Sequence, residues 1–255
     1  LNIASMCKKL GVQFLYPSSC SVYGTASDSL LSEDSLTNPQ TPYSINKLQV
    51  EEGLSNLASK SFSPIALRFG TVYGLSSRIR FDVVINMLCG LALTTNKVTL
   101  NSNGLAWRPH LHIEDVCESF RCCLDWNPNI GKLTILNVGQ NEDNYKVIDI
   151  AKIIHSNVEG SELTYLDGSV DHDGNDLVKD RKIQDGVDTR SYQVSFDRIH
   201  KVLPNFKCKW TVEKGIKNLL NSLRSLPLDN ELFNRREFYR LQQIEFLHQT
   251  NKIND

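Results

Sequence analysis

Two side chains that could transfer a proton stand four residues apart in this 255-residue sequence. Tyr43 and Lys47 fall in a segment that we predict as a helix over 42–58, so about one helical turn separates them on one face. A neighbouring ammonium lowers the pKa of a phenol, and the resulting phenolate can act as a general base near neutral pH. By spacing alone the pair is also typical of a solvated helix surface, so its chemistry depends on what lies beside it.

A cluster of small hydroxyl side chains, which includes Ser18, Ser19 and Ser21, precedes that helix. It follows the apolar segment 12–16, whose length and composition predict a buried parallel strand. Open α/β sheets bind ligands at the carboxyl ends of their strands, where a serine hydroxyl can hydrogen-bond a substrate alcohol. Together with Tyr43 and Lys47 the serines would form a proton-transfer set. The alternative is a turn whose hydroxyls bond to nearby backbone groups.

The elements that must position these residues follow from the spacing of the apolar side chains. The predicted helices cover 1–10, 42–58, 81–93, 113–126, 145–158 and 211–223. The predicted strands cover 12–16, 63–69, 98–100, 134–138 and 162–165, and the polar stretch 167–189 is expected to be a loop. Helices that alternate with strands predict an α/β fold with a parallel sheet. Apolar residues at three-residue spacing from Phe238 to Leu247 predict an amphipathic tail helix over 231–249.

The overall composition argues against several classes of protein. Hydrophobic residues make up 40% of the chain and charged residues 22%, which suits a packed core and argues against a disordered chain. The net charge of −1 gives no positive field for nucleic acid. The most apolar stretch, 81–93, is interrupted by polar residues and is too short to cross a bilayer. Seven cysteines without metal-ligand spacing indicate reduced thiols, so we expect a cytoplasmic protein without a membrane segment or a metal site.

Six short motifs follow one another in a recognisable order. They are SSCSVYG at 18–24, TPYSINK at 41–47, LRFGTVYG at 67–74, RPHLHIEDV at 108–116, NVG at 137–139 and WTVEKGI at 210–216. In this order they resemble the extended short-chain dehydrogenase/reductase family, and within it the NAD-dependent nucleotide-sugar epimerases and dehydratases. An ordered set of motifs is far more specific than any single one.

The resemblance implies a doubly wound, Rossmann-like parallel sheet with a smaller α+β substrate lobe. Residues 1–74 and 106–138 would form the carboxyl-terminal part of the Rossmann-like core, 75–105 and 139–226 the substrate-binding lobe, and 227–255 the tail helix. None of the 14 glycines forms the glycine-rich loop that binds the cofactor in this fold. The chain therefore resembles the family without its first βαβ units, and we expect residues upstream of Leu1.

The resemblance also assigns roles to individual residues. Ser19 matches the catalytic hydroxyl, Tyr43 the catalytic base, and Lys47 the residue that lowers the pKa of the base and holds the nicotinamide ribose. The residues expected to contact the cofactor are Ser18, Tyr43, Lys47 and Gly70. The residues expected to contact the substrate are Ser19, Ser21, Thr71, Arg80, Asn86, Arg108 and Arg190. Arg108 and Arg190 match two arginines that grip a nucleotide diphosphate, a task that suits planar guanidinium groups.

Two departures from the family pattern bear on the reaction. The sugar-nucleotide 4,6-dehydratases carry Asp-Glu after the catalytic hydroxyl residue, where this sequence has Cys20 and Ser21. Water elimination would therefore lack its acid and base, and epimerisation or alcohol oxidation fits better. Thr71 stands where many members have Asn, which alters one phosphate contact.

The resemblance thus implies an NAD-dependent nucleotide-sugar epimerase that transiently oxidises a sugar hydroxyl, with NADP as the alternative cofactor. Its expected partner is a nucleotide-diphosphate sugar, not a nucleic acid or a membrane, and a homodimer is left open. Two alternatives also stay open. One is a nucleotide-sugar dehydrogenase or reductase that releases its product. The other, if the chain truly starts at residue 1, is a non-catalytic sugar-nucleotide-binding protein.

Overall fold

A computed structural model describes residues 1–25, 30–126, 128, 131–165 and 190–253, which divide into two compact units. The first unit contains the described residues of 1–72, 106–145 and 190–211, and the second contains those of 73–105, 146–165 and 212–253. The segment 190–211, which the resemblance groups with the substrate lobe, lies in the first unit. The loop predicted for 167–189 lies outside the described residues.

The first unit is built on a parallel sheet of three strands in the order β1-β3-β7. These strands are β1 (Leu15–Ser19), β3 (Ile65–Phe69) and β7 (Thr134–Val138). The register pairs Ser19 with Phe69 and Phe69 with Val138, so the three carboxyl ends lie side by side. All of β3 is buried, because neighbouring strands cover its edges and packed side chains cover both of its faces. The predicted α/β fold with a parallel sheet is confirmed.

The first strand begins and ends later than the predicted segment 12–16. Val12 is 51% exposed and precedes β1, whereas Pro17, Ser18 and Ser19 continue the pairing with β3. Proline cannot donate to a neighbouring strand, and it is tolerated here because β1 lies at an edge of the described sheet. The hydroxyl cluster therefore starts within the strand itself.

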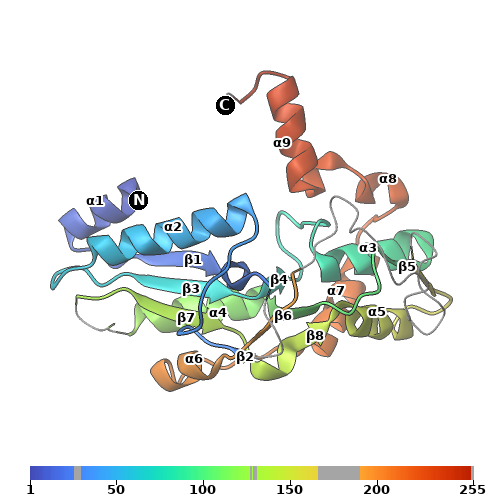
Figure 1. The fold of residues 1–255 in the computed structure, drawn as a ribbon. Helices are drawn as coiled ribbons and strands as arrows, with labels where there is room; N and C mark the ends of the chain where they lie inside the picture. Colours follow the sequence, from blue (N-terminus) through green and yellow to red (C-terminus); the bar gives the residue numbers. More distant parts are fainter. Residues whose placement is uncertain (26–29, 127, 129–130, 166–189, 254–255) are drawn as a thin grey trace. The chain divides into compact units, whose positions relative to one another are not determined.

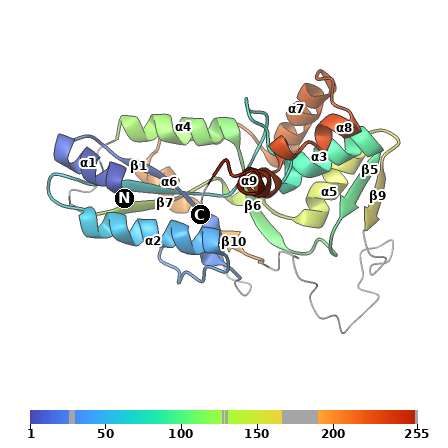
Figure 2. The same ribbon diagram turned by 90° about the horizontal axis from the view of Figure 1, so that it is seen from above.

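Helices cover both faces of this sheet, as Figure 2 shows. α2 (Pro42–Leu57) lies on one face and α4 (Ile113–Leu124) on the other. α1 (Asn2–Leu10) packs beside α2, and α6 (Asp197–Val202) contacts β7. The side chains between these layers form a large apolar cluster around β3 and a smaller one that contains Ala4, Leu54 and Phe62. The sheet is thus wound with helices on both sides, as the resemblance implied.

Short strands and turns complete the first unit (Figure 1). β6 (Trp107–His112) lies between β4 (Thr71–Tyr73) and β8 (Asn144–Lys146), and β2 (Leu30–Leu31) pairs with β10 (Gln193–Val194). The 3-10 turn η1 (Cys20–Tyr23) follows β1 directly, and a second one, η2 (Asn141–Asp143), precedes β8. The chain passes to the second unit at the ends of β4 and β8.

The second unit packs three helices around a two-stranded parallel sheet. β5 (Lys97–Leu100) pairs with β9 (Glu162–Tyr165), and α3 (Val84–Thr95) packs against β5, α5 (Val147–Ser156) and α7 (Val212–Arg224). Gly215 lets α7 pack closely against the side chain of Tyr73, because a Cβ atom there would lie 2.2 Å from the Tyr73 hydroxyl oxygen. The helices predicted over 81–93, 145–158 and 211–223 are confirmed with shifts of a few residues at their ends.

The single tail helix predicted over 231–249 is wrong. The structure has α8 (Asn230–Phe233), the 3-10 turn η3 (Arg236–Phe238) and α9 (Arg240–Gln249) in its place. Phe233 is buried with its ring centre 4.8 Å from that of Phe81, and the backbone N–H of Phe81 donates to the carbonyl oxygen of Phe238 at 3.1 Å. These contacts hold the chain out of a continuous helix. α9 buries none of its residues, and Leu241 is 73% exposed, so the three-residue spacing marks no packed face.

Candidate active site

The helix that carries Tyr43 and Lys47 is fixed at its start by a reciprocal cap. The Thr41 hydroxyl accepts from the backbone N–H of Ser44 at 3.2 Å, and the Ser44 hydroxyl accepts from the backbone N–H of Thr41 at 3.0 Å. Pro42 occupies the first helical turn, where its missing N–H has no intrahelical partner to lose. Tyr43 therefore stands in the first turn of α2 with 57% of its surface exposed.

Lys47 connects α2 to the end of β1. Its ammonium donates to the carbonyl oxygen of Pro17 at 2.6 Å, two residues before Ser19. The same nitrogen lies 5.4 Å from the ring centre of Tyr43 and 4.9 Å from that of Tyr16. Burial lowers the pKa of Lys47, and the negative charge of Glu51 acts in the opposite direction. The structure thus brings the predicted Tyr–Lys pair to the strand end that carries the predicted serine.

Tyr16 is the second phenol close to Lys47. It lies on β1, where burial, reinforced by the charge of Glu51, raises the pKa of Tyr16 to about 12. At neutral pH this phenol keeps its proton. Tyr16 is therefore a poor candidate for a general base, whereas Tyr43 stands exposed one helical turn before Lys47.

The three serines at the end of β1 have different surroundings. The Ser19 hydroxyl accepts from the backbone N–H of Ser21 at 3.2 Å and so caps η1. Ser18 is buried, and its hydroxyl donates to Glu51 Oε1 at 2.5 Å. Ser21 is 6% exposed, and its hydroxyl has no hydrogen-bond partner among the described residues. A buried hydroxyl without a partner costs free energy, and a hydrogen bond between a ligand and the Ser21 hydroxyl would remove that cost.

Gly70 follows β3 at the same edge of the sheet. A Cβ atom at Gly70 would lie 3.0 Å from the carbonyl oxygen of Pro109 in β6, which is closer than side chains ordinarily approach. Glycine therefore lets the turn from β3 to β4 pass close to β6. Thr71 begins β4 and is half-buried. Both residues lie at the predicted edge, and their contacts with cofactor and substrate stay predictions.

Arg108 and Arg190 meet within the first unit. Arg108 is a buried residue of β6, and its guanidinium donates to the carbonyl oxygens of Trp107, at 2.9 Å, and of Arg190. The guanidinium carbon lies 5.5 Å from the ring centre of Tyr192. The two arginines predicted to bind a diphosphate are thus joined through the backbone of Arg190.

Arg80 and Asn86 belong to the second unit. The Arg80 guanidinium donates to both carboxylate oxygens of Asp82, at 2.8 and 3.0 Å. The Asn86 amide donates to the backbone carbonyl of Arg80 at 3.0 Å and accepts from the backbone N–H of Gly74 at 3.0 Å. Both ends of this buried amide stabilise the chain before α3. The contacts predicted between these two residues and the substrate stay predictions.

Two charged residues beside the site were not among those predicted. Glu51 on α2 and Arg68 on β3 form an ion pair at 2.6 Å, and each side chain is only 3% exposed. Arg68 also donates to the Tyr23 hydroxyl at 3.0 Å, and that hydroxyl donates to Asn137 Oδ1 at 2.8 Å. The signal in the sequence is an arginine inside the apolar segment 65–69, because a buried charge requires a partner.

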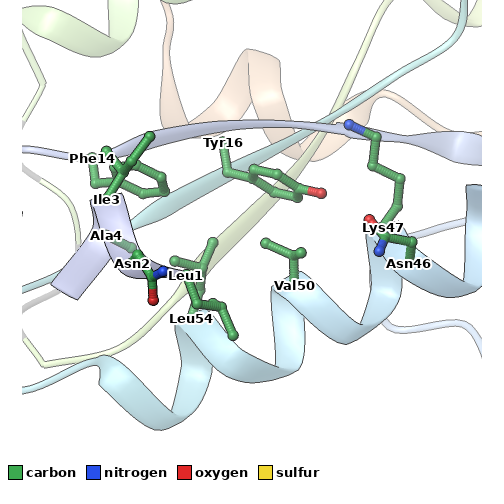
Figure 3. A pocket seen from close by; sticks show the side chains of 10 residues that line it. All are labelled: Leu1, Asn2, Ile3, Ala4, Phe14, Tyr16, Asn46, Lys47, Val50 and Leu54. Carbon is green, nitrogen blue, oxygen red and sulfur yellow. The ribbon is translucent and has the colours of Figure 1, made fainter. Parts of the chain in front are cut away.

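A pocket of about 600 Å³ opens between α1, β1 and α2 (Figure 3). It is lined by Leu1, Asn2, Ile3, Ala4, Phe14, Tyr16, Asn46, Lys47, Val50 and Leu54. Lys47 lies at one end of this pocket and Phe14 and Ile3 at the other, with the Tyr16 ring between them. The amphipathic Lys47 side chain thus borders an apolar hollow on the side of β1 that faces α1 and α2.

The described residues carry neither a metal-binding cluster nor a membrane-spanning helix. No group of three or more His, Cys, Asp or Glu side chains there could hold a metal ion. No described helix combines the length and the apolar character that crossing a bilayer requires.

Comparison with known proteins identifies relatives of the chain. The family model described as NAD dependent epimerase/dehydratase family matches residues 1–139. An uncharacterised UDP-glucose epimerase of Bacillus subtilis is 29% identical over 156 residues, which are 60% of this chain and 48% of that protein. The dTDP-D-glucose 4,6-dehydratase of Mus musculus is 26% identical over 218 residues, which are 83% of this chain and 56% of that protein. The chain thus spans about half the length of the curated relatives that it matches.

A solved structure supports the same assignment. MoeE5 in complex with UDP-glucuronic acid and NAD superposes with a TM-score of 0.70 at 26% identity, over 88% of this chain and 69% of that one. The family model covers more than half of the chain, and the matched residues include the helix with Tyr43 and Lys47 and the serine cluster at the end of β1. The chain belongs to the NAD-dependent epimerase/dehydratase family.

Proposed function

We propose that this chain carries the proton-transfer residues of an NAD-dependent nucleotide-sugar epimerase. The observation that carries the proposal is the hydrogen bond from Lys47 to the Pro17 carbonyl oxygen, at 2.6 Å. This bond holds the helix with Tyr43 against the strand end with Ser19. The family assignment and the similarity to a structure in complex with UDP-glucuronic acid and NAD support the substrate class and the cofactor.

The residues at the carboxyl edge of the sheet fit a nicotinamide nucleotide. Lys47 and Tyr43 offer an ammonium and a phenol for a ribose, Ser21 offers a buried hydroxyl without a partner among the described residues, and Gly70 follows β3 at the same edge. Ser18, as part of the same strand end, is proposed to support this site. NAD, or NADP in its place, supplies a hydride acceptor when bound.

The protein's own residues would move the proton of the sugar hydroxyl. Tyr43, one helical turn from the Lys47 ammonium, would act as the general base that accepts the proton from the sugar oxygen. Ser19 can donate its hydroxyl hydrogen to the same oxygen, because its present bond uses it only as an acceptor. If the hydride returned to the opposite face of the oxidised sugar and Tyr43 returned the proton to its oxygen, the net change would be inversion at one carbon.

Two arginines are proposed to hold the substrate's diphosphate. Arg108 and Arg190 meet in the first unit, and guanidinium groups bind phosphate oxygens through paired hydrogen bonds. Thr71 and Ser21 are proposed as further contacts at the sheet edge, and Arg80 and Asn86 as contacts to the sugar or the base. A homodimer in the cytoplasm also stays a proposal, which light scattering and localisation of the tagged protein would test.

The reaction is tested by the product that the full-length protein forms. The protein is incubated with NAD and a panel of UDP, dTDP, GDP and CDP sugars, and the product is followed by mass and by NADH absorbance. An isomer without net NADH supports the epimerase. A ketosugar formed together with NADH would instead identify a dehydrogenase. A product that has lost water would identify a dehydratase. Binding without any product would identify a sugar-nucleotide-binding protein.

A further inference from the structure

Five buried polar side chains form a continuous chain of hydrogen bonds beneath the candidate site. We call this set the Glu51 network, and its members are Ser18, Tyr23, Glu51, Arg68 and Asn137. Each is at most 3% exposed. The network starts on α2, contacts the end of β1, crosses β3 and reaches β7 through η1. It therefore joins the carboxyl ends of all three strands of the sheet to the helix that carries Tyr43.

The carboxylate of Glu51 is the centre of the network. Its Oε1 accepts from Ser18 Oγ at 2.5 Å and from Arg68 Nε at 3.0 Å, and its Oε2 accepts from the second arm of Arg68 at 2.6 Å. Three donors on one carboxylate leave it a single orientation. Burial acts to lower the pKa of Arg68, but the hydrogen bonds and charge of Glu51 outweigh it and raise the pKa, so the guanidinium stays charged.

Glu51 also shares a helix face with the candidate catalytic residues. Tyr43, Lys47 and Glu51 are spaced by four residues on α2, so they lie above one another on one side of the helix. Pro17 accepts from Lys47, and the next residue, Ser18, donates to Glu51. Two consecutive residues of β1 are thus bonded to two residues of α2 that are one turn apart, which fixes the register between strand end and helix.

A purely stabilising role does not account for this arrangement. Removing two charges from water is costly, and apolar side chains of similar volume often stabilise a core as well as a buried ion pair does. A buried ion pair instead holds its partners in one geometry. The ion pair between Glu51 and Arg68 lies within one helical turn of Lys47 and contacts the residue beside Ser19.

We propose that Glu51, held by Arg68, is a positioning residue that fixes the Lys47 ammonium at the end of β1. The proposal deepens the proposed function, because it concerns the lysine on which Tyr43 would depend, and its first test needs no catalysis. Glu51 itself touches neither substrate nor cofactor in this account and acts through Lys47 and Ser18.

The charges around Lys47 give the direction of the expected effect. On its own helix Lys47 neighbours Tyr43 and Glu51, on β1 it neighbours Tyr16, and Arg68 of β3 lies behind Glu51. Burial lowers the pKa of Lys47, and Glu51 raises it. Replacing Glu51 by glutamine removes the negative charge and leaves Arg68 unneutralised, and both changes lower the pKa of Lys47 further.

The direct test is an NMR titration of Lys47 in Glu51→Gln and in wild type. The protein is labelled with ¹³C and ¹⁵N at lysine, and the Lys47 signal is assigned with Lys47→Arg. Glu52→Gln is the matched control, since Glu52 is the exposed neighbour on the same helix and its replacement changes the net charge equally. We expect the Lys47 midpoint to move to lower pH in Glu51→Gln and to stay in place in Glu52→Gln. Equal midpoints in all three proteins would overturn the proposal.

A second variant protects the test against loss of folding. Ser18→Ala removes one contact of Glu51 and leaves the ion pair with Arg68 in place. We expect the variant to keep the fold by circular dichroism, while the Lys47 signal moves because the strand end loses one of these two hydrogen bonds to α2. An unchanged Lys47 signal in a folded Ser18→Ala would contradict a positioning role.

Activity provides the third readout. In the full-length enzyme, the alkaline limb of the kcat profile should move to lower pH in Glu51→Gln but not in Glu52→Gln. A shifted NMR midpoint together with an unchanged activity profile would overturn the functional part of the proposal. If Tyr43 proves dispensable for turnover while the NMR shift is present, the proposed function fails and the positioning of Lys47 by Glu51 stands.

Discussion

Two arginine–carboxylate pairs of the same design lie in different surroundings in the two units. Arg68 and Arg80 each use Nε and a terminal nitrogen to grip the two oxygens of one carboxylate. In the first unit the side chains of Arg68 and Glu51 are both 3% exposed, whereas in the second those of Arg80 and Asp82 are 44% and 23% exposed. The two pairs therefore share their hydrogen-bonding geometry but differ in their exposure to water.

The difference in burial gives the two pairs different uses. Water screens the exposed pair, so Arg80 can exchange Asp82 for a ligand's oxygen at little cost. The buried pair cannot separate without leaving a charge in the core, so Arg68 and Glu51 hold their neighbours in place. We therefore expect the first unit to present a fixed set of proton-transfer groups. In the second unit we expect the Arg80 guanidinium to be able to change its hydrogen-bonding partner.

The largest expected effect is the loss of one member of the buried pair. Glu51→Ala should lower the free energy of unfolding by about 3–5 kcal/mol, because it leaves the Arg68 guanidinium uncompensated in the core. Arg80→Ala should cost at most about 1 kcal/mol. Urea unfolding of both variants measures the contrast, and equal losses would contradict the difference between the pairs.

A double replacement separates stability from positioning. Glu51→Leu combined with Arg68→Met removes both charges, so the variant should recover most of the stability that Glu51→Ala loses. The Lys47 resonance should nevertheless differ from wild type, since Ser18 has lost its acceptor. Unfolding curves and the labelled-lysine spectrum check the two parts, and a double variant as unstable as Glu51→Ala would break the explanation.

Removal of Arg190 is expected to weaken binding of a nucleotide diphosphate. A charged hydrogen bond contributes roughly 1.5–3 kcal/mol, so Arg190→Ala should raise the Kd of the full-length protein by about ten- to a hundred-fold. Arg121→Ala is the control, because Arg121 is an exposed arginine of the same unit that pairs with Glu118. Calorimetric titration with UDP, GDP, CDP and dTDP measures the effect and identifies the base. Equal affinity of wild type and Arg190→Ala would remove Arg190 from the site.

The smallest expected effect belongs to Asp82. Burial acts to raise the pKa of Asp82, but hydrogen bonds from Arg80 and from the backbone N–H of Arg240 outweigh it, so the net pKa is lowered. A lowered carboxyl pKa adds stability above the ordinary carboxyl range, and this stability is lost as pH falls through the lowered value. Asp82→Asn should therefore cost at most about 1 kcal/mol at neutral pH and nothing in strong acid. The free energy of unfolding is measured for both proteins across this pH range. A difference between them that did not change with pH would contradict this explanation.

The sequence was informative wherever a local pattern determines the structure. Thr41, Pro42 and Ser44 signal the start of a helix, and α2 begins there. The apolar segment 134–138 coincides with β7. The motif around Tyr43 and Lys47 predicted that the two side chains share one face of α2, because residues four apart lie on one side of a helix, and Lys47 on this face bonds to β1.

The sequence was uninformative where a contact depends on distant residues. Arg68 stands out as a charge in an apolar strand, but its partner Glu51 is 17 residues away and is found only once α2 and β3 have packed. The tail illustrates the converse error. Leu241 and Ile244 follow a helical spacing, yet both are exposed and α9 buries nothing, so periodicity alone did not reveal where packing would occur.

Tyr43, placed by Lys47 at the end of β1, is proposed as the proton-transfer group. The most direct measurement compares Tyr43→Phe with Tyr16→Phe in the full-length protein, because these are the two phenols beside the Lys47 ammonium. Nucleotide-sugar binding should be nearly unchanged in both. Turnover should fall by about 10²–10⁴-fold in Tyr43→Phe and persist in Tyr16→Phe. Turnover retained in Tyr43→Phe would contradict the account.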